Sequence, residues 1–152
     1  MLVTRAAPWT PDPPASLQRL VGVVVREVSL TDFTWGFQFG EVGTLCTNSL
    51  WRVLVGGRHA FGSGDHGQKY GLPAPKDAVA LGRARLVGRR AVEIAALRGT
   101  GDLRILLEGG VTLEIFATST GYEPWQVYWP DGSGVFANGG NFSEFPPARE
   151  ER

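Results

Sequence analysis

The two halves of the sequence match in order, and this internal repeat constrains the fold more than any other feature. The triplet Leu-Val-Gly stands at residues 20–22 and again at 86–88, and each copy leads into a strand pattern rich in Val and Ile. Each half then carries an alternating strand, a strand with Thr-Leu, and a Trp-x-Val strand that begins at Trp51 or Trp125. The repeat predicts two tandem β-meander lobes related by a pseudo-twofold axis.

The spacing between the halves indicates an insertion in the second one. Matching positions are 66 residues apart at Leu-Val-Gly and 74 apart at the tryptophans, and the extra eight residues fall around the stretch ATSTGYEP. Glycine and proline supply 21 and 10 of the 152 residues, so the chain turns often. Short apolar runs between such turns are typical of a mainly β fold. We expect the two lobes to close on each other as a sandwich or a barrel.

One short helix is expected in the crossover between the halves. The stretch PAPKDAVALGRARLVG places Pro75 in the first turn and Asp77 near the helix N-terminus, where an acid is favourable. Gly82 weakens the pattern, so two to three turns are predicted. A first strand is expected to begin at Leu20 and Val21.

The predicted organisation is a single β domain over residues 17–145, with a short extension at each end. Its parts are a Pro-rich N-terminal arm at 1–16, half-repeats at 17–61 and 86–140, a connecting segment at 62–85, and a polar tail at 146–152.

The charge balance and the cysteine content restrict the class of protein. Fifteen Lys and Arg face fifteen Asp and Glu, which disfavours a dedicated nucleic-acid binder. The single cysteine, Cys46, cannot form a disulfide within the chain. The first residues lack the apolar core of a signal peptide, and no run has the length of a membrane-spanning helix. A cytoplasmic protein without membrane contact is expected.

The stretch GSGDHGQKYGLPAP, residues 62–75, sets a histidine beside an acid, and could be catalytic, metal-binding or a turn. A metal site needs three or four ligands, and the only other histidine is His59. We expect Asp65 to cap the turn by accepting backbone N–H groups. We expect His66 to bond across to the other lobe or to the Tyr122–Trp125 segment. Pairing of His66 with Ser63 or Cys46 as a nucleophile has no positive support.

A second candidate stretch, residues 119–125, reads STGYEPW and leads into the second Trp strand. Glu123 could act as a general base if desolvated, or it could accept backbone hydrogen bonds in a loop. The tryptophans could be core residues or, where exposed, part of a binding face.

Two sequence boxes resemble an uncharacterised family of small bacterial proteins. The first box, D-x-G-Q-x-[FY]-G-x-P, matches Asp65–Pro73, and the second, S-x-G-Y-E-x-W, matches Ser119–Trp125. The resemblance extends over about residues 17–142. It implies an accessory or immunity-type factor of bacterial conflict systems and carries no established activity.

The sequence therefore predicts a non-enzymatic binding protein that engages a protein partner or a second copy of itself, with no cofactor, no metal and no catalytic residue. The alternative is a small-molecule binder or enzyme with a cleft between the lobes. The candidate binding residues are Trp51, Asp65, His66, Gln68, Tyr70, Tyr122, Glu123 and Trp125.

Overall fold

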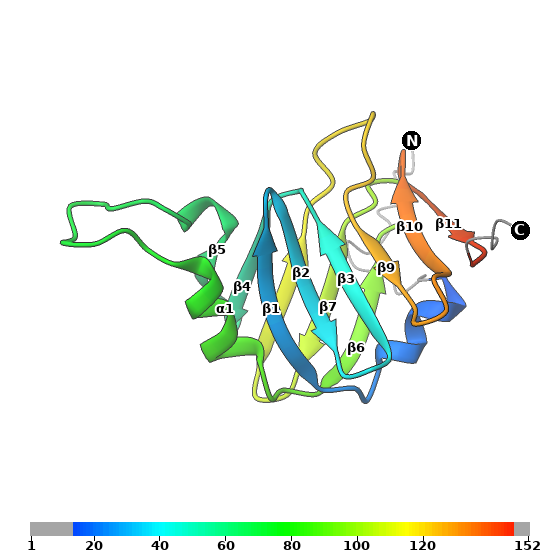
Figure 1. The fold of residues 1–152 in the computed structure, drawn as a ribbon, viewed down its shortest axis with the longest axis horizontal. Coiled ribbons are helices and arrows are strands. Elements are labelled where there is room, and N and C mark those ends of the chain that lie inside the picture. The colour runs from blue at the N-terminus through cyan, green and yellow to red at the C-terminus, as the bar shows by residue number, and fades with distance from the viewer. Residues whose placement is uncertain (1–13, 148–152) are drawn as a thin grey trace, which may run out of the picture.

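The computed structural model describes residues 14–147, which fold into two antiparallel sheets packed face to face (Figure 1). The first sheet contains, in spatial order, β1 (Val25–Thr31), β2 (Thr34–Phe39), β3 (Gly43–Thr47), β9 (Gln126–Tyr128), β10 (Gly134–Asn138) and β11 (Asn141–Phe145). The second contains β5 (Arg58–Gly62), β4 (Trp51–Val55), β8 (Val111–Ile115), β7 (Leu103–Leu107) and β6 (Ala91–Ala96). Neither sheet closes on itself. The mainly β prediction is confirmed as a sandwich, and the barrel alternative is not.

The two halves of the repeat exchange their hairpins. Strands β1 to β3 form a meander in the first sheet, and β6 to β8 form the matching meander in the second. The β4–β5 hairpin of the first half, however, pairs with β8, and the β9–β10 hairpin of the second half pairs with β3. The half-repeats 17–61 and 86–140 are therefore not separate lobes, because each sheet contains strands of both.

The pseudo-twofold symmetry extends to irregularities of the strands. A bulge separates Val25 from Glu27 in the β1–β2 pair, and a bulge separates Ala91 from Glu93 in the β6–β7 pair. The two bulges are 66 residues apart, the same offset as the Leu-Val-Gly triplets. A bulge bends its strand and increases the local twist, so both meanders curve alike around the core.

The Leu-Val-Gly triplets join the two halves at one end of the sandwich. The Gly22 N–H donates to the carbonyl of Ala91 at 2.8 Å, and the Gly88 N–H donates to the carbonyl of Val25 at 2.8 Å. Both glycines have left-handed φ angles, +86° and +90°, which a side chain would strain. The leucine of each triplet is buried. The triplet thus occurs twice because the chain makes the same backbone turn where it enters β1 and where it enters β6.

Aromatic side chains fill the space between the sheets. The Trp51 ring packs edge-on against Trp35, Phe37 and Phe61, with centroids 4.9, 5.2 and 6.1 Å away. Trp125 is fully buried, and its indole N–H donates to a backbone carbonyl at 2.8 Å. Aromatic rings therefore occupy much of the interface between the two sheets.

Each half begins with a helical segment. A 3₁₀ helix, η1 (Ala15–Leu20), stands where a strand was expected to begin, because residues three apart eclipse in a 3₁₀ helix and Leu17 and Leu20 both enter the core. The predicted crossover helix is α1 (Ala78–Leu86), but Pro75 lies outside it. Most of the predicted N-terminal arm, residues 1–13, and the end of the tail, 148–152, lie outside the described residues.

Helix α1 begins at a side-chain cap and packs closely on the first sheet. The Asp77 carboxylate accepts from the N–H groups of Val79 and Ala80 at 3.0 and 3.1 Å. A Cβ atom at Gly82 would lie 3.0 Å from Val28, so the glycine that weakens the helix also lets it approach β1. Over residues 14–147 no helix has the length and apolar character needed to cross a membrane.

The triplet glycines provide a test of the chain crossings. Gly22→Ala and Gly88→Ala should each lower the free energy of unfolding by about 1–2 kcal/mol, because alanine is strained at positive φ. Urea denaturation followed by tryptophan fluorescence measures this loss. Gly64→Ala is the matched control: Gly64 is not left-handed and has open space around its Cβ position. An equal loss at Gly64 would show that the triplet geometry is not responsible.

Candidate binding site

The connection between β5 and α1 projects from the sandwich as an arm, residues 62–77 (Figure 1). Its outgoing and returning segments are held together by backbone hydrogen bonds. The Gly67 N–H donates to the Lys76 carbonyl at 2.9 Å, and the Lys76 N–H donates to the Gln68 carbonyl at 2.8 Å. The arm is therefore an internally bonded structure rather than an open loop.

Asp65 organises the base of the arm. Its carboxylate accepts from the Gly62 N–H at 3.0 Å and from the Tyr70 hydroxyl at 3.1 Å. The bond from Gly62 and then the bond from Tyr70 hold the pKa of Asp65 below its usual value, whereas the bond to Asp65 raises the pKa of Tyr70. The predicted capping role of Asp65 is confirmed, and its hydrogen-bonding capacity is used structurally.

His66 joins the arm to the helix. Its Nδ1 accepts from the Ala78 N–H at 3.1 Å, and its ring stands edge-on to Trp35 with centroids 5.3 Å apart. The first N–H groups of a helix have no partner within it, and Asp77 takes only two of them here. The prediction that His66 reaches the other lobe or the Tyr122–Trp125 segment is therefore wrong. The residue is a clasp, but its partner is the N-terminus of α1.

The arm exposes two apolar side chains to solvent, those of Leu72 and of Tyr70, whose ring reaches back toward the base of the arm. Tyr70 and Leu72 are 62% and 49% exposed, and Gln68 is also exposed. The Lys76 ammonium lies 5.8 Å from the centre of the Tyr70 ring. Leu72 was not among the predicted binding residues, although a leucine between Gly71 and Pro73 has no neighbour in sequence with which to form a core. That isolation is the signal that could have identified it.

A shallow depression of about 320 Å³ lies where the arm meets the sandwich. Its apolar lining includes Leu50, Tyr70 and Phe116, and Leu50 is 58% exposed. Ser63 stands in the same depression, but its hydroxyl donates to the Trp51 carbonyl and accepts from the Trp51 N–H. The Trp51 ring itself is core. The depression therefore offers an apolar surface beside the arm, and the Ser63 hydroxyl within it is bonded to the backbone of Trp51.

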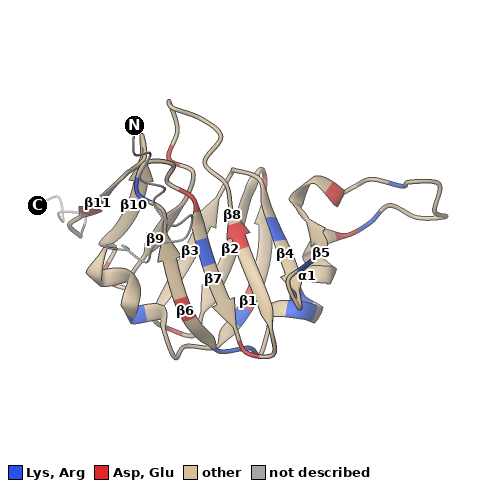
Figure 2. Cartoon of the chain, turned by 180° about the vertical axis from the view of Figure 1, so that it is seen from behind, with Lys and Arg blue, Asp and Glu red and all other residues tan. Residues whose placement is uncertain are grey.

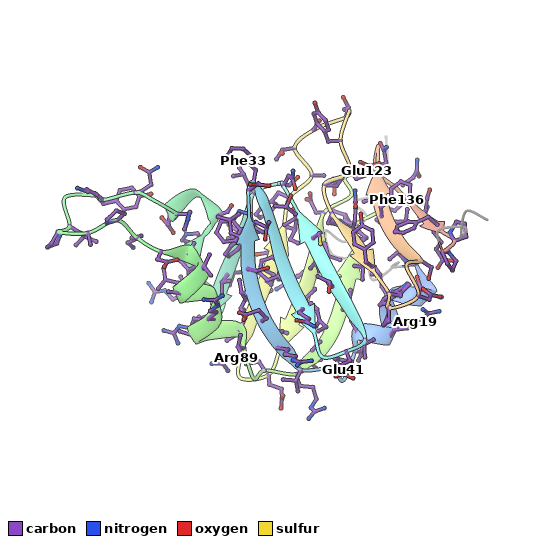
Figure 3. All side chains as sticks on the ribbon, viewed as in Figure 1. Arg19, Phe33, Glu41, Arg89, Glu123 and Phe136 are labelled. Carbon is purple, nitrogen blue, oxygen red and sulfur yellow. The ribbon has the colours of Figure 1, made fainter. Side chains whose placement is uncertain are left out.

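The second sequence box lies at a different place. The Tyr122 side chain is 78% exposed, Glu123 is half-buried, and Trp125 is fully buried. Glu123 and Tyr122 line a depression with Asn48 and Gln126, which shares no residue with the one at the base of the arm. Phe33 and Glu123 lie at the same end of the sandwich, away from the tip of the arm (Figures 1 and 3). The two boxes thus do not form one pocket.

The metal-ligating side chains of the described residues do not cluster. Over residues 14–147 no three His, Cys, Asp or Glu side chains are grouped as metal ligands. Cys46 lies on the outer face of β3, in a depression with Glu123 and Tyr128, and burial raises the pKa of its thiol. The thiol is therefore not paired with His66.

Comparisons of the chain with protein-family models, curated proteins and solved structures give no match. The resemblance to small bacterial proteins stays a prediction, and the site is interpreted from its own chemistry.

Acidification should loosen the arm through Asp65. Because the pKa of this carboxyl is lower in the folded arm than its ordinary value of 3.8, its stabilising bonds are present above pH 3.8 and are lost as the pH falls through the folded-state value. Amide hydrogen exchange of Gly62 should accelerate over that range while the exchange of core amides stays slow. An Asp65→Asn variant should lack this response. The same acid response in that variant would assign the change to another group.

Substitution of His66 tests the clasp. His66→Leu leaves the buried Ala78 N–H without an acceptor and should cost about 1–3 kcal/mol in unfolding free energy. His66→Asn places an amide oxygen near the position of Nδ1 and should recover part of that loss. Thermal and urea unfolding measure both variants. Equal stability of the two would show that the hydrogen bond is not what matters at this position.

Proposed function

We propose that the protein is a non-enzymatic binding protein whose arm, residues 62–77, engages a protein partner. The observation that carries the proposal is the exposure of two apolar side chains, Tyr70 and Leu72, on an arm that is internally hydrogen-bonded. A binding element that is already ordered loses little conformational entropy when it docks. Exposed apolar side chains on a projecting segment are typical of protein contacts.

The distribution of charge indicates the chemistry of that partner. Residues 58–90, which include the arm and α1, hold seven Lys and Arg against two Asp. Residues 91–147 hold two Arg against seven Asp and Glu. The net charge of zero therefore conceals a basic part and an acidic part of the chain (Figure 2). The arm itself holds two Lys and two Asp, and the basic surplus lies beside it, at Arg58 and at the four arginines of residues 83–90. A partner with an apolar pocket for the arm and an acidic surface facing these arginines would suit this arrangement.

The sequence resemblance suggests a setting for this interaction. An immunity-type or accessory factor in a bacterial cytoplasm would use such an arm to hold one specific protein. A homodimer would be the alternative occupant of the same surface. Catalysis has no support from the hydrogen-bonding of Ser63, Asp65 or His66, since each is committed to the backbone or to the arm itself.

Site-specific photo-crosslinking tests the proposal. A benzophenone residue at position 72 should capture a partner in an extract of the source cells, and 92 is the control position. Val92 is 56% exposed on β6, so it matches Leu72 in exposure but not in location. Adducts should form at position 72 in preference to 92 and should decrease with rising salt, which screens exposed charges.

The identity of the adduct decides the outcome. One discrete protein species, acidic and resistant to nuclease treatment, supports the proposal. Equal adducts at positions 72 and 92, a nuclease-sensitive adduct, or a cross-link only to a second copy of the chain would contradict it.

A further inference from the structure

The four central strands of the first sheet carry no charged residue on their outer face, whereas the edge strands β1 and β11 carry Arg26, Glu27 and Glu144. Along β2, β3, β9 and β10 the inward residues are buried, and none of the alternating outward residues is Asp, Glu, Lys or Arg. The row across these four strands reads Gly36, Cys46, Gln126 and Phe136. In a chain with 20% charged residues, a neutral outward face over four strands is a distinct chemical surface.

The second sheet shows what the pseudo-twofold places at equivalent positions. Arg52 on β4 corresponds to Gln126 on β9, and Glu114 on β8 corresponds to Cys46 on β3. In each sheet the two residues are cross-strand partners. The Arg52 Nε donates to the Glu114 carboxylate at 3.1 Å, and Glu114 is 3% exposed. Charged positions are visible on the strands of this sheet in Figure 2. The halves therefore share their core and differ in the chemistry of their outer faces.

A groove runs along β3 and β9 on the neutral face. Tyr128 borders two depressions, one of about 410 Å³ with Gln38 and Thr44, the other of about 260 Å³ with Cys46 and Gln126. The second continues past Gln126 into a depression of about 430 Å³ beside the 116–125 loop. Adjacent depressions share lining residues, so the three follow one another along β3 and β9, and together they are called the groove. Three successive depressions suit a linear molecule of several units rather than a single small ligand.

The side chains along the groove define the class of ligand. Carboxamides such as Gln38 and Gln126 both donate and accept hydrogen bonds, and Thr44 adds a hydroxyl. Tyr128 is 41% exposed and offers an aromatic face, while its ring is supported by Phe145 at 5.5 Å and its hydroxyl donates to the Gln126 side-chain oxygen. Aromatic faces with a few orienting polar groups suit a ligand that has both apolar faces and hydroxyl edges.

The charges on the groove are few, and its strands leave no edge for a peptide. Arg26, which pairs with Glu41 at 3.6 Å, lines the first depression, and Glu123 lines the other two. An extended peptide usually adds to an unpaired strand edge, but β3 and β9 are bonded to neighbours on both sides. We propose that this groove binds a neutral oligosaccharide, with Tyr128 as the stacking platform and Gln38, Thr44 and Gln126 as hydrogen-bonding groups.

The single cysteine of the chain provides a built-in reporter, because Cys46 lies in the groove. Alkylation of Cys46 by iodoacetamide is measured at mildly alkaline pH with and without maltohexaose, cellohexaose or chitohexaose, and with the charged hexagalacturonate for comparison. At least one neutral hexasaccharide should slow the reaction saturably, about tenfold at ten times its dissociation constant. It should also shift the amide NMR signals of Gln126 and Tyr128.

Matched variants locate the binding. Tyr128→Ala should weaken the protecting saccharide about tenfold, because the stacking ring is lost. Tyr128→Phe keeps the ring and should retain most of the affinity. Leu54→Ala is the control, since Leu54 pairs with Thr112 on the second sheet as Tyr128 pairs with Thr44 on the first. Circular dichroism checks that each variant is folded.

Several results would overturn the proposal. These are protection by none of the neutral hexasaccharides at millimolar concentration, stronger protection by hexagalacturonate, or equal weakening by Leu54→Ala and Tyr128→Ala. A Leu72→Asp variant should bind the saccharide as the wild type does, because the arm and the groove are separate surfaces. Failure of the arm in partner capture and failure of the groove in saccharide binding are thus distinguishable.

Discussion

The structure depends on two seams at which strands of one half pair with strands of the other. The β3–β9 and β4–β8 pairs complete the two sheets, and without them each half would be a meander and a separate hairpin. The seams are reinforced by side chains: the Thr47 hydroxyl donates to the Pro124 carbonyl at 2.6 Å across the first, and Arg52 bonds Glu114 across the second. Burial of Trp51 and Trp125 beside the seams makes both halves necessary to one core.

The exchange of hairpins also explains where the arm can stand. In the first half, β5 ends at the edge of the second sheet, so the chain leaves the sandwich there before it returns as α1. In the second half the chain turns directly from β10 into the edge strand β11 instead. The core tolerates little variation because it is close-packed, whereas an edge and an outer face are free to diverge. The arm, the neutral face and the uneven distribution of charge all lie in these freer places.

Local features of the fold could be predicted from the sequence, and long-range pairings could not. Asp65 as a turn cap and Asp77 near the start of α1 follow from chemistry within a few residues. The strands follow one another in the same order whether a hairpin pairs with the meander of its own half or with that of the other half. The exchange of hairpins therefore has no local signal in the sequence. The partner of His66 and the separation of Glu123 from the arm are likewise properties of the assembled sandwich. The strand expected to begin at Leu20 is a 3₁₀ helix instead, because Leu17 and Leu20, three residues apart, share a face of a 3₁₀ turn but would point to opposite faces of a strand.

The seams have a consequence for the order of events during synthesis. The bonded pairs across them are 77 and 62 residues apart in sequence, so the first half leaves the ribosome with one edge of β3 unpaired and with the β4–β5 hairpin not yet bonded to β8. Folds dominated by such distant pairings form slowly, and their unpaired edges are open to association in the meantime. Until the second half of its own chain is made, the β4–β5 hairpin can pair with β8 of a neighbouring copy instead. Crowded translation would therefore favour intertwined dimers in which two chains exchange the hairpins that one chain normally exchanges with itself.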